Sequence, residues 1–251
     1  PISIVAAKGA WLKDVDGREM LDLSMGFGAL LVGHLNEEVV KEAHATLDVG
    51  TLFATPSPIT RDGAEIICRR FGLDMVRFAN SGTEAVMQAV RLARYHTKRS
   101  HLVRFSGSYH GWWEDVQPGP GNPMPPRETY TLSEMSERSL AVLRTRKDIA
   151  CVLVNPLQAL HPNSPAPGDS SLVDSSRKVA YDRAAYTAWL KQLREVCTQR
   201  GIVLIFDEVF LGFRLAPGGA QAYFGVQADM VTYGKTLGGG LPVGVVCGRS
   251  A

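Results

Sequence analysis

The stretch Gly201-Ile-Val-Leu-Ile-Phe-Asp207-Glu208-Val209 joins a continuous apolar run to two carboxylates. A strand in a parallel sheet is covered on both faces, so it is apolar at every position rather than at every second one. Residues 203–206 therefore predict a buried strand in a sheet with helices on both faces. The acidic pair lies where this strand ends.

Short apolar runs and helical patterns alternate on either side of this strand. Further strands are predicted at residues 76–79, 102–105, 151–154 and 230–233, and helices at residues 84–97 and 183–200. Such alternation is typical of a mostly parallel sheet covered by helices. The predicted fold class is therefore α/β.

The first part of the chain follows a different pattern. Asp16-Gly17 lies between extended runs at residues 10–12 and 20–23, a combination that favours a tight hairpin. Apolar residues at helical spacing predict helices at residues 37–49 and 59–71. We therefore expect an N-terminal segment, built from a hairpin and a helix, ahead of the α/β domain.

Domain boundaries follow from these patterns. We place the N-terminal segment at residues 1–50 and the α/β domain at residues 51–251. The chain has no initiator Met and stops inside the apolar run at residues 243–251, so we expect it to be a fragment of a longer protein.

Nine of the 14 prolines fall at residues 118–167, which predicts loops at residues 117–126 and 160–168.

Composition excludes several classes of protein. Hydrophobic residues make up 45% and charged residues 21%, as in ordinary globular domains. A net charge of +2 without runs of like charge argues against nucleic-acid and membrane partners. No apolar stretch approaches the roughly 18–20 residues that span a bilayer. The four cysteines form no Cys-x-x-Cys pair, so we expect no metal site, no disulfide framework and a cytoplasmic protein.

A candidate anion site lies at Asn80-Ser81-Gly82-Thr83-Glu84, where a predicted strand ends and a helix begins. The first amides of a helix lack intrahelical partners and lie at the positive end of its dipole. The amides of Gly82 and Thr83 and the hydroxyls of Ser81 and Thr83 are therefore placed to bind a phosphate. The alternative is an ordinary N-cap formed by Ser81.

A second candidate motif, Ser106-Gly107-Ser108-Tyr109-His110-Gly111, follows the strand at residues 102–105. Open α/β sheets bind ligands at the carboxyl edge of their strands, where Tyr109 can stack on a flat ring. Two alternatives stay open. Tyr109 can be a buried tyrosine with a satisfied hydroxyl, and His110 can be a loop anchor.

Two charged residues carry the strongest chemical signal. Burying the Asp207 carboxylate without a partner costs several kcal/mol, so it must meet either an arginine, with Arg214 as the candidate, or a cationic ligand atom. Lys235 follows a predicted strand and precedes Gly238, Gly239 and Gly240, which give a cofactor backbone room. Desolvation there lowers the pKa of a lysine and leaves a nucleophilic amine, whereas a solvated surface lysine is the alternative.

Taken in this order, the residues resemble those of the class III aminotransferases of pyridoxal-phosphate (PLP) fold type I. The resemblance spans the chain and includes Asp14-Val-Asp-Gly-Arg18 and the block at residues 232–244. Within this family, the hydrophobic residue Phe210 directly after Asp-Glu-Val makes the chain similar to the glutamate-1-semialdehyde aminomutase branch. Residues 157–186 are similar to aminotransferase domains of microcystin-type and nodularin-type polyketide and nonribosomal peptide synthases. Asn155-Pro156 departs from the Glu-Pro common in the family, so no carboxylate role carries over.

The resemblance implies a fold, a cofactor and roles for individual residues. It implies the large domain of PLP fold type I, with a small C-terminal domain lying beyond residue 251. The implied catalytic residues are Lys235, Asp207 and Tyr109, and the implied cofactor-binding residues are Ser81, Gly82, Thr83, Tyr109, His110, Asp207, Val209 and Lys235. Tyr109 and Val209 are expected to clamp the ring from opposite faces.

The implied function is an aminotransferase in secondary-metabolite biosynthesis. It would move an amino group from an amino acid donor to a carbonyl on a carrier-tethered polyketide chain. The resemblance also implies a homodimer. Two alternatives stay open: a glutamate-1-semialdehyde-type 2,1-aminomutase, and a catalytically silent PLP-binding fragment.

Overall fold

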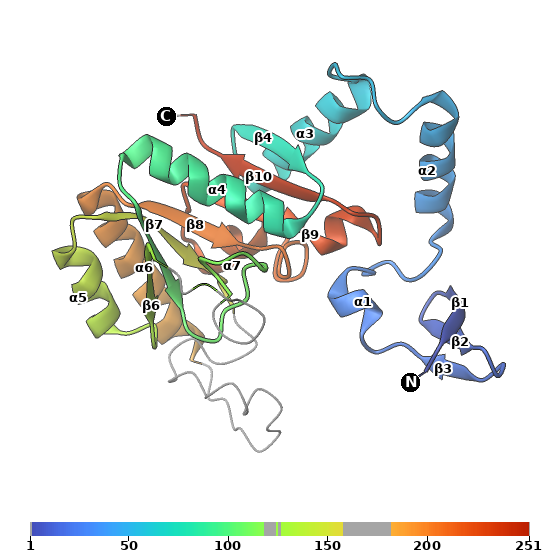
Figure 1. Cartoon of the computed structure of the whole chain (residues 1–251), viewed down its shortest axis with the longest axis horizontal. Helices are drawn as coiled ribbons and strands as arrows, with labels where there is room; N and C mark the ends of the chain where they lie inside the picture. The colour runs from blue at the N-terminus through green and yellow to red at the C-terminus, as the bar shows by residue number, and fades with distance from the viewer. Residues whose placement is uncertain (1, 118–123, 125–126, 158–181, 251) are drawn as a thin grey trace.

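The computed structural model describes residues 2–117, 124, 127–157 and 182–250. It contains a three-stranded antiparallel sheet and a seven-stranded sheet with the order β4-β10-β9-β8-β7-β5-β6. Figure 1 shows the small sheet and α2 beside the larger body. No helix in these ranges is long and apolar enough to cross a membrane. Most of the proline-rich loops at residues 117–126 and 160–168, and most of the stretch at residues 157–186, lie outside the described residues.

The elements of the N-terminal part are β1 (Ile4–Lys8), β2 (Trp11–Asp14), β3 (Glu19–Leu21), the short turn α1 (Met25–Gly28), α2 (Glu37–Val49) and α3 (Pro58–Phe71). The predicted hairpin is confirmed as β2 and β3, and β1 adds a third strand. The two predicted helices are confirmed as α2 and α3. A Ser57 N-cap and Pro58 in the first turn start α3 one residue earlier than predicted.

The elements of the large body are β4 (Met75–Ala79), α4 (Gly82–Thr97), β5 (His101–Phe105), β6 (Thr129–Leu132), α5 (Glu137–Thr145), β7 (Ile149–Val154), α6 (Arg183–Arg200), β8 (Val203–Asp207), α7 (Gly219–Phe224), β9 (Met230–Gly234), the 3-10 turn η2 (Lys235–Gly238) and β10 (Gly244–Gly248). Every strand and helix predicted for this part is present, with ends that differ by one or two residues. The sequence patterns do not predict β6, α5, α7 or β10.

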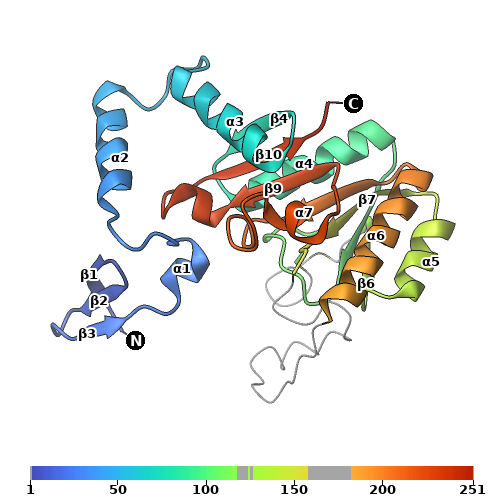
Figure 2. The ribbon, with the colours of Figure 1, turned by 180° about the vertical axis from the view of Figure 1, so that it is seen from behind.

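The large sheet is mostly parallel, as predicted. Only β10 among the described strands of this sheet runs against its neighbours, β4 and β9. Helix α4 covers one face, and α3, α5, α6 and α7 cover the other (Figure 2). Strand β7 is apolar throughout because both of its faces are covered: Cys151 and Leu153 pack toward α4, and Val152 and Val154 pack toward α6.

This topology positions the candidate site. Strands β4, β5, β7, β8 and β9 point the same way, so the segments that follow them begin at one edge of the sheet. Those segments begin with Asn80, Ser106, Asn155, Glu208 and Lys235. Side chains far apart in the sequence are thereby brought to one place.

Glu208, directly after β8, is fully buried. Its Oε2 accepts a hydrogen bond of 2.8 Å from the Ala220 amide in the first turn of α7, whereas Oε1 has no hydrogen-bond partner among the described residues. Desolvation raises the pKa of Glu208 to about 7; the Ala220 bond opposes this rise and the nearby charge of Asp207 adds to it. The carboxyl therefore holds its proton more tightly in the folded chain than in the unfolded one.

We expect Glu208 to make stability depend on pH. An acid whose pKa rises from 4.5 to about 7 on folding costs nothing well below pH 4.5; the cost grows as pH rises from 4.5 through 7, and it is complete above that. Glu208→Gln keeps an acceptor for Ala220 and removes the charge. Urea titration should show a gain of up to about 3 kcal/mol in the free energy of unfolding at about pH 8, and little gain at about pH 4. An equal gain at both pH values would contradict this.

Candidate active site

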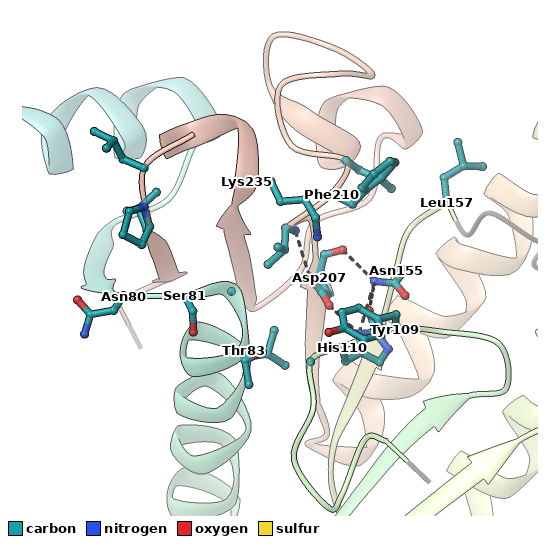
Figure 3. A pocket seen from close by; sticks show the side chains of 18 of the residues that line it. Asn80, Ser81, Thr83, Tyr109, His110, Asn155, Leu157, Asp207, Phe210 and Lys235 are labelled. Atoms are coloured by element: carbon teal, nitrogen blue, oxygen red, sulfur yellow. Dashed lines mark hydrogen bonds and ion pairs between the residues drawn. The ribbon is translucent and has the colours of Figure 1, made fainter. Parts of the chain in front are cut away.

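The carboxyl edge of the large sheet borders a cavity of about 670 Å³. Its wall includes all of the predicted site residues: Ser81, Gly82, Thr83, Tyr109, His110, Asp207, Val209 and Lys235. They come from the segments after β4, β5, β8 and β9 and from the end of β8 (Figure 3). A volume in this range is usual for small-molecule sites.

The start of α4 forms one end of the cavity. Ser81 is the N-cap, and its Oγ accepts a hydrogen bond of 3.2 Å from the Glu84 amide. The Glu84 carboxylate in turn accepts one of 2.7 Å from the Asn80 amide. The predicted N-cap is therefore present, and it is compatible with anion binding because the helix gives the amides of Gly82 and Thr83 no intrahelical acceptor.

Glycines allow close packing around this helix start. A Cβ on Gly82 would lie 2.6 Å from Val209 Cγ1, and one on Gly244 would overlap the Ser81 carbonyl. Gly244 is paired with both Ala79 and Gly234 in the sheet, so β10 holds the ends of β4 and β9 together. The position of the Ser81 turn therefore depends on the absence of a side chain at residue 244.

Asp207 lies in the wall of the cavity and is only 3% exposed. Its Oδ2 lies 2.7 Å from His110 Nδ1, and its Oδ1 accepts hydrogen bonds from the Val209 amide (3.1 Å) and the Thr232 hydroxyl (3.2 Å). The alternative of an ion pair between Asp207 and Arg214 is wrong. Arg214 donates instead to the carbonyls of Phe210 and Gly28 and to the Thr236 hydroxyl, and the His110 ring is the partner of the buried carboxylate.

His110 is itself buried and connects two loops. An ionised carboxylate only accepts hydrogen bonds, so His110 Nδ1 carries the proton that is donated to Asp207. Its Nε2 has no hydrogen-bond partner among the described residues. The loop-anchor interpretation of His110 is therefore correct, and the anchor is the side chain of Asp207.

Asn155 adds a second connection, which the sequence signalled only as a departure from Glu-Pro. Its Nδ2 lies 3.4 Å from the carbonyl oxygens of both Tyr109 and Asp207, so its amide bridges the loops after β5 and β8. Its position directly after a buried strand is the signal that could have identified it as a site residue.

Lys235 begins η2, and its side chain points into the cavity toward Asp207 (Figure 3). Its φ of 42° is in the left-handed region, which costs a non-glycine residue roughly 1–3 kcal/mol. Desolvation lowers its pKa, with Arg214 adding to the effect and Asp207 opposing it. The expected fall in pKa is confirmed, and the alternative of a solvated surface lysine is wrong.

Tyr109 lies at the mouth of the cavity and is 62% exposed, so the alternative of a buried tyrosine is wrong. Apolar side chains also line the cavity, namely Leu157, Phe210 and Leu241. Phe210 and Leu241 are themselves at least half exposed. The sequence patterns do not assign Leu157 or Leu241 to the site, because both lie in loops without periodicity.

These features define what the cavity can bind. A helix start suits an anion, Asp207 suits a protonated ring nitrogen, and Lys235 supplies an amine that reacts with a carbonyl group. Among the described residues, no three histidine, cysteine or acidic side chains gather as a metal site. A flat molecule that carries both an anionic group and a carbonyl group fits this combination.

Comparisons with known proteins agree with this chemistry. The family Aminotransferase class-III matches residues 1–114 and 182–251. A glutamate-1-semialdehyde 2,1-aminomutase of Methanothermobacter thermautotrophicus is 38% identical over 99% of this chain and 58% of that protein. The chain thus spans less than two thirds of the length of this relative.

Two solved structures have the same fold. A transaminase with PLP bound has a TM-score of 0.84 and 34% identity, and the match covers 99% of this chain and 58% of that one. An omega-transaminase from Sphaerobacter thermophilus has a TM-score of 0.81 and 32% identity, covering 100% and 58%. The expected aminotransferase fold is confirmed, and because the family match extends over well more than half of its residues, the chain belongs to the class-III aminotransferases.

Proposed function

We propose that the chain is the cofactor-binding part of a PLP-dependent enzyme that moves an amino group to a carbonyl carbon. The observation that carries this proposal is the meeting of Lys235, Asp207 and the start of α4 in one cavity. Membership of the class-III aminotransferases supports it. The similar transaminase structure has PLP bound, which supports the choice of cofactor.

The residues present fit PLP. The amides of Gly82 and Thr83 suit its phosphate, and the buried Asp207 carboxylate suits its ring nitrogen. Lys235 offers the amine that its carbonyl group requires. The cavity volume of about 670 Å³ is ample for a molecule of this size.

When bound, PLP supplies an electron sink for negative charge at the substrate carbon. Asp207 holds a proton on the ring nitrogen. Raising the pKa of that nitrogen by about three units takes roughly 4 kcal/mol, within the reach of a buried carboxylate. His110 and Thr232 keep Asp207 oriented by occupying its two oxygens.

Lys235 acts as the anchor and as the proton carrier. Because desolvation lowers its pKa, more of the amine is neutral at a given pH, and Nζ can take a proton from the substrate carbon as a general base. Tyr109 and Val209 line the same cavity and would restrain the ring from its two faces. Ser81 and Thr83 would hold the phosphate through their hydroxyls.

Two versions of the reaction are supported by different observations. Similar curated proteins at 38% and 36% identity are named glutamate-1-semialdehyde 2,1-aminomutase, which favours a shift of the amino group within one small substrate. We take this as the first candidate. The second is transfer from an amino acid donor to a carrier-tethered acyl chain, for which the apolar side chains of Leu157, Phe210 and Leu241 in the cavity wall are suited.

The proposal also covers the oligomeric state, the cellular location and the domain organisation of the chain. We propose a homodimer, because large apolar side chains of the N-terminal part, such as Phe27 at 82% and Leu52 at 90% exposure, are uncovered. We propose a cytoplasmic protein, in keeping with its four free cysteines. We also propose that residues 1–50 form a segment separate from a cofactor-binding domain at residues 51–251.

Lys235→Ala tests the cofactor chemistry and the alternative of a silent fragment. Mixing the full chain with PLP should give absorbance near the visible edge, because a lysine imine absorbs there, and the variant should lose it. Lys191→Ala is the matched control, since Lys191 is an exposed lysine of α6. Equal absorbance in the wild type and in Lys235→Ala would sink the proposal. A band without turnover would favour the silent fragment.

Gly244→Ala tests the helix start as the phosphate site. The new Cβ would displace the Ser81 carbonyl, and we expect PLP affinity to fall by about tenfold or more, which corresponds to about 1.4 kcal/mol. Gly248→Ala is the control at the other end of β10, where the nearest atoms lie 3.9 Å from the added Cβ. Fluorescence titration with PLP measures both variants. Equal affinities would place the phosphate elsewhere.

Supplying substrates separately distinguishes the two reactions. An aminomutase should consume glutamate 1-semialdehyde with no other substrate present, because donor and acceptor carbons belong to one molecule. A transaminase should require an added keto compound and should form a new amino compound from it. Chromatography of the products with and without the acceptor measures the difference. Strict dependence on the acceptor would contradict the aminomutase candidate.

A further inference from the structure

Arg214 joins three distant segments beside Lys235. Its Nε donates a hydrogen bond of 2.6 Å to the Phe210 carbonyl, and its Nη2 donates to the Thr236 hydroxyl (3.1 Å) and to the Gly28 carbonyl. The Thr236 hydroxyl also lies 3.2 Å from the Gly28 carbonyl. Gly28 is 186 positions from Arg214 in the sequence, so this cluster fastens the N-terminal part of the chain to the loop that bears Lys235.

The turn that carries Gly28 has an unusual backbone. Met25, Gly26, Phe27 and Gly28 all have positive φ values, and two of them carry side chains that disfavour this conformation. Asp22 holds the start of the turn by accepting hydrogen bonds from the amides of residues 24 and 25. At its other end, a Cβ on Gly28 would lie 2.6 Å from Arg214 Nη2, so the close approach requires glycine.

The opposite side of the cluster touches the neighbours of Lys235. Thr236 directly follows Lys235, the residue whose φ is 42°. The Phe210 ring lies near both cations, with Arg214 Cζ 5.0 Å and Lys235 Nζ 5.6 Å from its centroid. A shift of Arg214 would therefore be felt both through the backbone of Thr236 and through the ring of Phe210.

We propose that Arg214 is a positioning residue that couples the docking of the turn at Met25–Gly28 to the placement of the Lys235 amine. This inference rests on the role proposed for Lys235. With the turn docked, the Gly28 carbonyl accepts from Arg214 and Thr236 together and holds the strained backbone of Lys235. With the turn undocked, both donors lose this acceptor and the backbone at Lys235 relaxes. The charged groups that act on Lys235 are Asp207 and Arg214, and Asp207 is in turn held by His110.

Hydrogen exchange on the cofactor-free chain tests the docking. Arg214→Lys keeps the charge but loses the planar fork of donors, and Thr236→Val removes one hydroxyl. The amides of Gly28 and Leu30, which are hydrogen-bonded within the turn, should exchange about tenfold faster in both variants. Arg194→Lys is the control, because this arginine pairs with Asp229 at the other end of the sheet. Unchanged exchange in both variants would overturn the proposal.

The link to Lys235 is tested by the rate at which PLP attaches to the chain. This rate is measured from the PLP absorbance at several pH values. Arg214→Lys and Thr236→Val should slow attachment several-fold with little change in the midpoint of the pH profile. Arg214→Met should also move the midpoint to higher pH, because a cation that lowers the pKa of Lys235 is gone. Faster exchange together with an unchanged attachment rate would show a merely structural arginine and overturn the coupling. If the coupling fails in this way but Lys235→Ala still loses the PLP absorbance, the proposed function stands without the coupling. If Lys235→Ala keeps the absorbance, the proposed function itself is refuted.

Discussion

A carboxylate buried at the end of a central strand is the constraint on which the site depends. Asp207 tolerates burial because His110, Thr232 and the Val209 amide all donate to it. Each of these donors is fixed in turn by a different loop or strand of the sheet edge. Satisfying one charge therefore organises the loop after β5, strand β9 and the turn after β8 around a single cavity.

The sheet topology makes this organisation possible. Parallel strands deliver an acid, an amine and a helix start to one edge, and β10 runs against its neighbours to bring Gly244 beneath the Ser81 turn. Close packing of Gly82 against Val209 and of Gly244 against Ser81 leaves the start of α4 little freedom to move. Lys235 and the turn that contacts its loop both have strained backbone, and there the conformation is held by tertiary contacts rather than by local preference.

Much of the fold follows from the sequence, because buried strands and amphipathic helices have periodic patterns. The strands at β4, β5, β7, β8 and β9 are predicted to within two residues. Strand β6 is missed because its residues Thr129–Leu132 form a partly polar edge strand, and β10 because glycines bound it. The residues predicted for the site all line the cavity, since they lie at or just after strand ends, whereas Asn155, Leu157 and Leu241 are missed. The partner of Asp207 is not, because local sequence cannot show that a histidine 97 positions away reaches it while nearby Arg214 turns aside.

The proposed function requires Asp207 and Lys235 to hold opposite ends of one PLP molecule. A crystal structure of the chain grown with PLP tests this most directly. We expect continuous density from Lys235 Nζ to the cofactor, with the ring nitrogen about 2.6–3.0 Å from an Asp207 oxygen. Cofactor density attached to another lysine, or a ring nitrogen directed away from Asp207, would contradict it.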